Sequence, residues 1–194
     1  MIDSRKLLEA LRKVLKQVED FAREHIDSHS DLEAGLRAEW QQARDSGRVG
    51  SSYLDWRDEE ITQAAVHWVL ACVYLRFIED NGLCDRPWLS GATRAQRDLA
   101  QDRYEQHFRA RPLDSDEHYL RACFEDAARL PAMGGLFDPN HNPLWRIGAT
   151  GDGAKALLDL LRAVDPDTGQ VKFDFRAALP SPPGGGAGGE GWLP

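Results

Sequence analysis

The feature that most constrains this fold is one long segment, at about residues 58–80, that is apolar on almost every side of a helix. Its centre, AAVHWVLACVYL, is interrupted only by His67. Asp55 can cap the start of this helix, and Asn81-Gly82 provides a left-handed stop. Arg76 has the helical pair spacing to Glu79 or Asp80, and this pair is expected near the exposed end of the helix. A helix that is apolar all round is usually buried all round. The sequence therefore predicts a mainly α-helical, multi-helix domain built around a buried central helix.

Other helices are expected to cover the central one. The first runs from residue 3 or 4 to about 24 and carries an apolar stripe at helical spacing, typical of a face that docks on its own domain. A coiled-coil partner is the alternative for that stripe. Capping-box patterns at Ser30/Glu33, Thr93/Gln96 and Asp114/Glu117 mark three further helix starts, and a short helix is expected at 153–164.

The last third of the chain changes character after Pro131. Residues 171–175 alternate apolar and polar side chains, so a small two-stranded β element is expected, with 144–147 as the partner strand. Residues 176–194 are rich in proline and glycine and are expected to form a disordered tail. The domain organisation predicted is thus a helical domain at 1–175 followed by this tail.

Charge and cysteine content exclude several classes of protein. The net charge is −8, so a small, self-sufficient binder of the basic kind for nucleic acids is excluded. Three cysteines without a CxxC pair argue against a disulfide framework and against a cysteine zinc site. No signal peptide and no transmembrane segment is recognised, so a soluble, cytoplasmic chain without membrane contacts is expected.

The motif nearest to a known catalytic one is Asn142-Pro143-Leu144-Trp145. Amino-group DNA methyltransferases hold a flipped base with a loop of Asn, Asp or Ser, then Pro-Pro and an aromatic residue. Here Leu144 replaces the second proline, and no glycine-rich methyl-donor turn after a buried strand precedes the loop. The favoured interpretation is a structural turn that places the Trp145 side chain in the core.

Gly148–Lys155 resembles a phosphate-binding loop but lacks its Gly-Lys-Ser/Thr ending. A turn in which Asp152 caps the short helix is favoured instead. His25 and His29 have a metal-ligand spacing but no third ligand nearby in the sequence, so solvated histidines at a helix end are expected.

The remaining candidates also favour structural roles. His67 is interpreted as a hydrogen-bonded core histidine, and Cys72 and Cys123 as small core side chains. Glu59 and Glu60 complement the helix dipole rather than forming a catalytic pair. We therefore assign no catalytic, cofactor-binding or metal-ligating residue.

Two stretches together resemble a known family. The first runs from WRDEEITQAA through FIEDNGL, at 56–83, and the second from GLFDPNHNPLWR to VKFDF, at 135–175. Both are similar to the amino-terminal helical region of PglX, the adenine-specific DNA methyltransferase of BREX (phage-growth-limitation) defence systems, particularly type 2. The resemblance covers roughly 1–175, and its motifs are structural rather than catalytic.

This resemblance implies a fragment of an S-adenosylmethionine-dependent methyltransferase that lacks the catalytic region, is inactive alone and contacts DNA only within the parent protein. Its partners would be the rest of that enzyme or other defence-system proteins. The alternative is a stand-alone helical interaction module that docks on another component of the same system. A reading of the DNA downstream in the other two frames separates the two, because only a fragment leaves the catalytic motifs encoded there.

Overall fold

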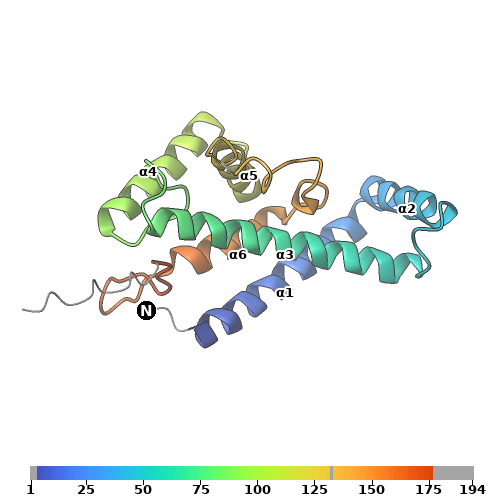
Figure 1. Cartoon of the computed structure of the whole chain (residues 1–194), viewed down its shortest axis with the longest axis horizontal. Coiled ribbons are helices and arrows are strands. Elements are labelled where there is room, and N and C mark those ends of the chain that lie inside the picture. The colour runs from blue at the N-terminus through green and yellow to red at the C-terminus, as the bar shows by residue number, and fades with distance from the viewer. Residues whose placement is uncertain (1–3, 132, 177–194) are drawn as a thin grey trace, which may run out of the picture.

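A computed structural model describes residues 4–131 and 133–176. This part of the chain contains six α-helices and one short 3₁₀ turn (Figure 1). They are α1 (Ser4–Ser28), α2 (Ser30–Asp45), α3 (Tyr53–Asp80), α4 (Arg94–Ala110), α5 (Asp116–Ala127), η1 (Pro143–Trp145) and α6 (Thr150–Arg162). The mainly α-helical fold predicted from the sequence is confirmed. The proposed tail, apart from Arg176, lies outside the described residues.

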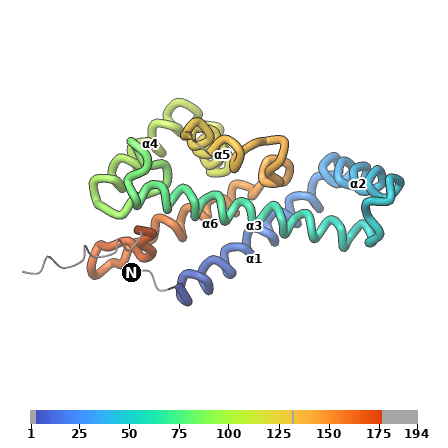
Figure 2. The backbone as a smooth tube through the Cα atoms, in the orientation of Figure 1, coloured from blue at the N-terminus to red at the C-terminus, as the bar shows by residue number. Residues whose placement is uncertain are grey.

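Helix α3 runs the length of the molecule and organises the rest (Figure 1). α1 and α6 pack on each other and on α3, while α5 packs on α6. α2 lies beside the amino-terminal half of α3, and α4 and α5 lie over its carboxyl-terminal half. The segment after α6 returns to the end of the molecule where α1 begins (Figure 2). The carboxyl end of α3 is therefore surrounded by segments that are distant in sequence.

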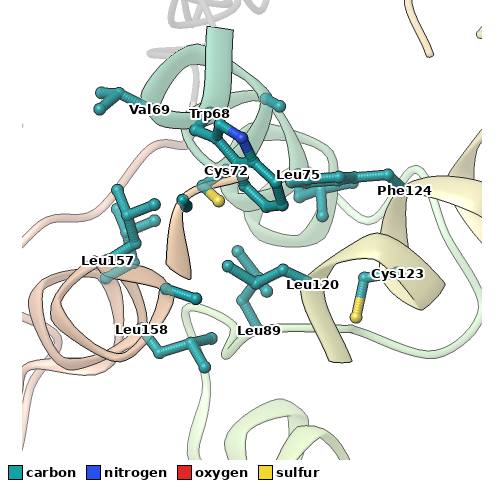
Figure 3. Packing of buried hydrophobic residues seen from close by; sticks show 14 of the residues in the cluster. Trp68, Val69, Cys72, Leu75, Leu89, Leu120, Cys123, Phe124, Leu157 and Leu158 are labelled. Carbon is teal, nitrogen blue, oxygen red and sulfur yellow. The ribbon is translucent and has the colours of Figure 1, made fainter. Parts of the chain in front are cut away.

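The main core lies where α3, α5 and α6 meet (Figure 3). Trp68, Cys72 and Leu75 of α3 are completely buried there, as are Leu120 and Phe124 of α5. Burying a large apolar side chain of this kind contributes roughly 1.5–3 kcal/mol each. The indole of Trp68 also donates a hydrogen bond of 3.0 Å to the carbonyl of Ile147, so its one polar atom is satisfied inside the core.

Helix boundaries follow the predicted signals in some places and not in others. The Thr93/Gln96 capping box is confirmed. The Ser30/Glu33 box is wrong, because α1 continues to Ser28 and Ser30 is already helical.

The predicted caps of α3, α5 and α6 are also displaced. Ser52, not Asp55, caps α3, and its hydroxyl accepts the N–H of Asp55. Ser115, not Asp114, forms the capping box of α5, with His118. α6 begins at Thr150, so Asp152 lies in its first turn rather than at its cap. In each case the helix starts at a residue other than the one whose polar side chain suggested a cap.

The two-stranded β element predicted at 144–147 and 171–175 is wrong. Residues 143–145 form the 3₁₀ turn η1, in which the Asn142 side chain accepts the N–H of Leu144 and Pro143 has no N–H to offer a strand. In the described residues, 171–175 contribute a single isolated bridge, between Val164 and Val171, across the turn at 165–169.

By length and composition alone, α3 is long and apolar enough to cross a membrane, contrary to the expectation that the chain holds no such segment. More than half of its most apolar stretch is nevertheless buried inside the protein, and the helix includes two buried arginines and two buried carboxylates. A central core helix of a water-soluble domain passes the same test of length and composition.

Candidate docking site on the central helix

The carboxyl end of α3 holds a buried charged cluster. Arg76, Glu79 and Asp80 lie on one face because their spacing of three and four residues matches the helical repeat. Arg76 Nη1 lies 3.1 Å from Glu79 Oε2 and 2.9 Å from Asp80 Oδ1. From the sequence, this pairing was expected near an exposed end of the helix. That was wrong, because loop segments from elsewhere in the chain fold over it.

Glu79 fixes one of these segments, the loop after α3. Its carboxylate accepts backbone N–H groups from Trp88, at 2.7 Å, and from Leu89 and Ser90. Burial raises the pKa of the Glu79 carboxyl, while Arg76 and these N–H donors act in the opposite direction. The Glu79 carboxylate thus accepts three backbone hydrogen bonds that this loop would otherwise lack inside the protein.

Asp80 and Asn81 fix the second segment, which follows α6. Asp80 Oδ2 accepts the N–H of Phe175 at 2.9 Å, and the Asn81 amide donates to the Phe175 carbonyl at 3.0 Å. Burial raises the pKa of the Asp80 carboxyl, opposed chiefly by Arg76. The FIEDNGL ending of the central helix therefore serves a structural purpose: it ties Phe175 to α3.

Whereas these charged residues of α3 are buried, three large apolar residues of the same helix are exposed. Leu70, Tyr74 and Phe77 are 57%, 43% and 39% exposed. Their spacing of four and three residues places them on one face of α3. The prediction that α3 is buried on every side is therefore wrong for this face, which no other described element covers.

This face forms one side of an apolar groove of about 540 Å³. Leu136 and Phe175 contribute from the segments before η1 and after α6. His67 also lines the groove instead of lying in the core, and its Nδ1 is 2.7 Å from the Gln63 carbonyl oxygen. We call the face formed by Leu70, Tyr74 and Phe77, with Leu136 and Phe175, the α3 groove.

The methyltransferase-like motif at 142–145 lies at the edge of the α3 groove, and its Asn142 and Trp145 side chains make hydrogen bonds to the backbone of the same segment. The Asn142 side chain donates to the Leu136 carbonyl at 2.8 Å and accepts the N–H of Leu144 at 3.1 Å. The Trp145 indole donates to the Phe137 carbonyl at 3.0 Å. The geometry is that of a structural turn that half-buries Trp145 against the core.

The other candidate residues do not come together. The rings of His25 and His29 contact each other, but among the described residues no group of three His, Cys, Asp or Glu side chains could hold a metal ion. Glu60 pairs with Arg146, whereas Glu59 is exposed. Gly148 packs against the Glu117 carboxylate, which leaves no room for a Cβ atom and no open phosphate cradle at that glycine.

The cysteines have the character expected of core residues. Cys72 and Cys123 are buried, and burial raises the pKa of both thiols, for Cys123 to about 12. Cys84 is half-buried, with its pKa raised to about 11. Thiols of this kind are poor nucleophiles at neutral pH because so little thiolate is present.

Sequence reasoning missed the α3 groove although a signal for it was present. The central segment has no polar face, yet the domain is too small to surround a helix of 28 residues on all sides. Apolar residues at positions 70, 74 and 77 give α3 a second apolar face. The other helices of the domain cover the opposite side of α3, so this second face is available to another segment or protein.

In its described residues, the chain is therefore a mainly α-helical module in which the segment at Phe175 is fixed to α3 beside an exposed apolar groove. The chain is 37% identical to the adenine-specific methyltransferase PglX of Streptomyces coelicolor over 192 residues, which are 99% of this chain and 15% of the relative. The resemblance stated from the sequence is thereby confirmed. The chain spans only this small part of its relative's length. No protein-family model and no solved structure matches it.

Proposed function

We propose that this chain is the amino-terminal helical module of a PglX-type adenine-specific DNA methyltransferase. The observation that carries the proposal is the similarity to PglX along almost the whole chain, confined to 15% of that protein's length. In this proposal the module is cytoplasmic, serves phage defence within a BREX-type system, and positions other parts of the enzyme instead of transferring methyl groups itself.

The side-chain geometry supports a non-catalytic task. A base-holding loop needs an Asn or Asp side chain that is free to accept hydrogen bonds from the amine of a flipped base. Asn142 instead bonds to backbone groups on both sides of its own turn. The S-adenosylmethionine site is accordingly proposed to lie in the remainder of the parent protein.

Calorimetry with S-adenosylmethionine tests this part of the proposal. The 194-residue chain is expected to release no heat of binding. Micromolar affinity at unit stoichiometry would contradict the proposal and would direct attention to the turn at 148–153.

A second candidate function is a stand-alone module that docks on another component of the same defence system. The α3 groove favours it, since an uncovered apolar face suits a separate partner as well as a covalently linked one.

A chimeric enzyme separates these functions. In the chimera, this chain replaces the matched 192 residues of the Streptomyces coelicolor protein. Methylated adenine is measured in genomic DNA from strains that carry the intact protein, the protein without the matched region, or the chimera. The proposal predicts loss of methylation on deletion and its return with the chimera. Full methylation after deletion, or none with the chimera, contradicts it.

A further inference from the structure

We infer that the α3 groove is the site where the remainder of a PglX-type methyltransferase docks, by inserting apolar side chains of a helix. This inference rests on the proposed function and names the partner of the module. The groove and the path of the chain at Phe175 carry it.

The shape of the groove suits a helix. Leu70, Tyr74 and Phe77 repeat along α3 at the spacing of one helical face, and Leu136 and Phe175 line the same groove from other segments. An amphipathic helix that lies in such a groove inserts side chains at positions i, i+3 or i+4, and i+7. The volume of about 540 Å³ has room for several apolar side chains.

The exposure of these residues distinguishes the groove from the rest of the described surface. Elsewhere, large exposed apolar side chains lie on separate segments, such as Leu8 on α1, Leu32 on α2, Leu99 on α4 and Leu113 in the loop between α4 and α5. Isolated exposed leucines are normal on protein surfaces, whereas a contiguous patch that includes two aromatic rings marks an interaction site. Tyr74 and Phe77 also contact each other, with ring centroids 6.3 Å apart.

The path of the chain indicates which partner fills the groove. Phe175 lines the groove and is held there through its backbone by Asp80 and Asn81. In a protein of the relative's length, the sequence beyond the matched region is therefore covalently tethered to a residue at the edge of this groove. Most of the relative lies outside the matched 15%.

Covalent linkage makes such docking favourable even over a modest area. A short linker holds the two parts at an effective concentration in the millimolar range, so an interface too weak for separate molecules is occupied within one chain. The same advantage is absent for a second copy of this chain or for a separate protein. The linked remainder of the enzyme is the occupant that the geometry favours.

Photo-crosslinking in the chimera tests this inference. A benzophenone amino acid replaces Leu70, and, in a matched control, the fully exposed Leu113. After irradiation, mass spectrometry is expected to find crosslinks from position 70 to sequence outside the matched 192 residues, and none from position 113 to those sites. Crosslinks from position 70 to a second copy, to another protein or only within the matched region would overturn the inference.

The crosslinks are interpreted independently of methylation. A chimera that methylates DNA but yields no crosslink from position 70 to the remainder overturns the docking inference and leaves the proposed function standing. A chimera that crosslinks as expected but restores no methylation contradicts the proposed function while supporting the docking contact.

Discussion

Arg76 and Glu79 form an ion pair 3.1 Å long in which neither side chain is exposed to solvent. Removing two charges from water is costly, and the cost is offset only when the pair has good geometry and makes further hydrogen bonds. Here Glu79 also binds three backbone N–H groups of the loop after α3, and Arg76 also binds Asp80, although the Nε of Arg76 has no hydrogen-bond partner among the described residues. The pair therefore links the end of the central helix to two chain segments that define one end of the molecule.

Replacing Glu79 with glutamine is expected to destabilise the protein strongly. The variant keeps the shape of the side chain but leaves Arg76 with one carboxylate instead of two and directs an amide toward N–H donors. Breaking a buried pair in this way costs about 3–5 kcal/mol. Chemical denaturation followed by circular dichroism measures the change in the free energy of unfolding.

The control for Glu79→Gln is Asp159→Asn, which breaks the exposed pair between Lys155 and Asp159. Solvent screens that pair, so the free energy of unfolding should be the same as in the parent within error. Equal effects of the two substitutions would contradict a structural role for the buried cluster.

Val69 and Leu70 are neighbours on α3 with opposite environments, since Val69 is 6% and Leu70 57% exposed. Val69→Asp places an uncompensated charge in the core and is expected to abolish cooperative unfolding. Leu70→Asp should retain a cooperative transition close to that of the parent. If Val69→Asp instead melts like the parent protein, α3 is not the central helix.

Alkaline pH is expected to destabilise the fold. Burial raises the pKa of Cys84 to about 11 and the pKa values of Cys123 and Tyr104 to about 12. The unfolded chain releases these protons first, from about pH 8.5 for cysteine and about pH 10 for tyrosine. The stability that these groups contribute is complete below those values and declines as pH rises toward the folded pKa values.

Urea denaturation at pH 7.5 and pH 10 measures this dependence. For a buried group such as Cys123 the loss approaches about 1.4 kcal/mol per pH unit once the unfolded thiol ionises. A Cys123→Ala variant, although less stable overall, should show a shallower decline. Equal stability of the parent protein at the two pH values would contradict the burial of these side chains.

The isolated chain is expected to bind duplex DNA weakly at most. Lys6, Arg12, Lys13 and Lys16 lie on α1 and are exposed, but Glu9 and Asp20 are exposed on the same helix. Non-specific binding of useful strength needs roughly 6–10 phosphate contacts and weakens steeply with salt. Fluorescence anisotropy at about 150 mM salt should detect no complex, whereas specific complexes reach about 10⁻⁸ M or tighter.

Tight binding at that salt concentration, lost in a Lys13→Glu/Lys16→Glu variant, would show that α1 is a DNA-contacting surface. A matched control is Glu9→Lys, which makes the same helix more basic and is expected to raise affinity only at low salt.

Local sequence signals predicted the helices well and the environments of their side chains less well. The extent of α3 follows from its apolar run and from Gly82, whose φ of +66° ends the helix. The capping box of Thr93 and Gln96 joins two residues within one helical turn, so sequence neighbours were sufficient to predict it.

Burial depends on distant segments, and there the sequence was insufficient. Arg76 was expected near an exposed end, yet Trp88 and Phe173, nine and ninety-four residues after Glu79, belong to loop segments that cover this end of α3. Leu70 was expected to be buried because it is apolar, yet nothing among the described residues packs over it. The apolar pattern of one helix cannot show which of its faces other segments of the chain cover and which stay exposed to solvent.

The most direct test of the central claim, that the α3 groove is an internal docking surface of a larger enzyme, is Leu70→Asp measured in two contexts by thermal unfolding. In the isolated 194-residue chain, the melting temperature should remain that of the parent, because position 70 faces solvent. In the chimera, the same substitution should lower the melting temperature by several degrees, whereas Leu113→Asp should leave it unchanged. Equal melting temperatures for the Leu70→Asp chimera and the unsubstituted chimera would contradict the claim.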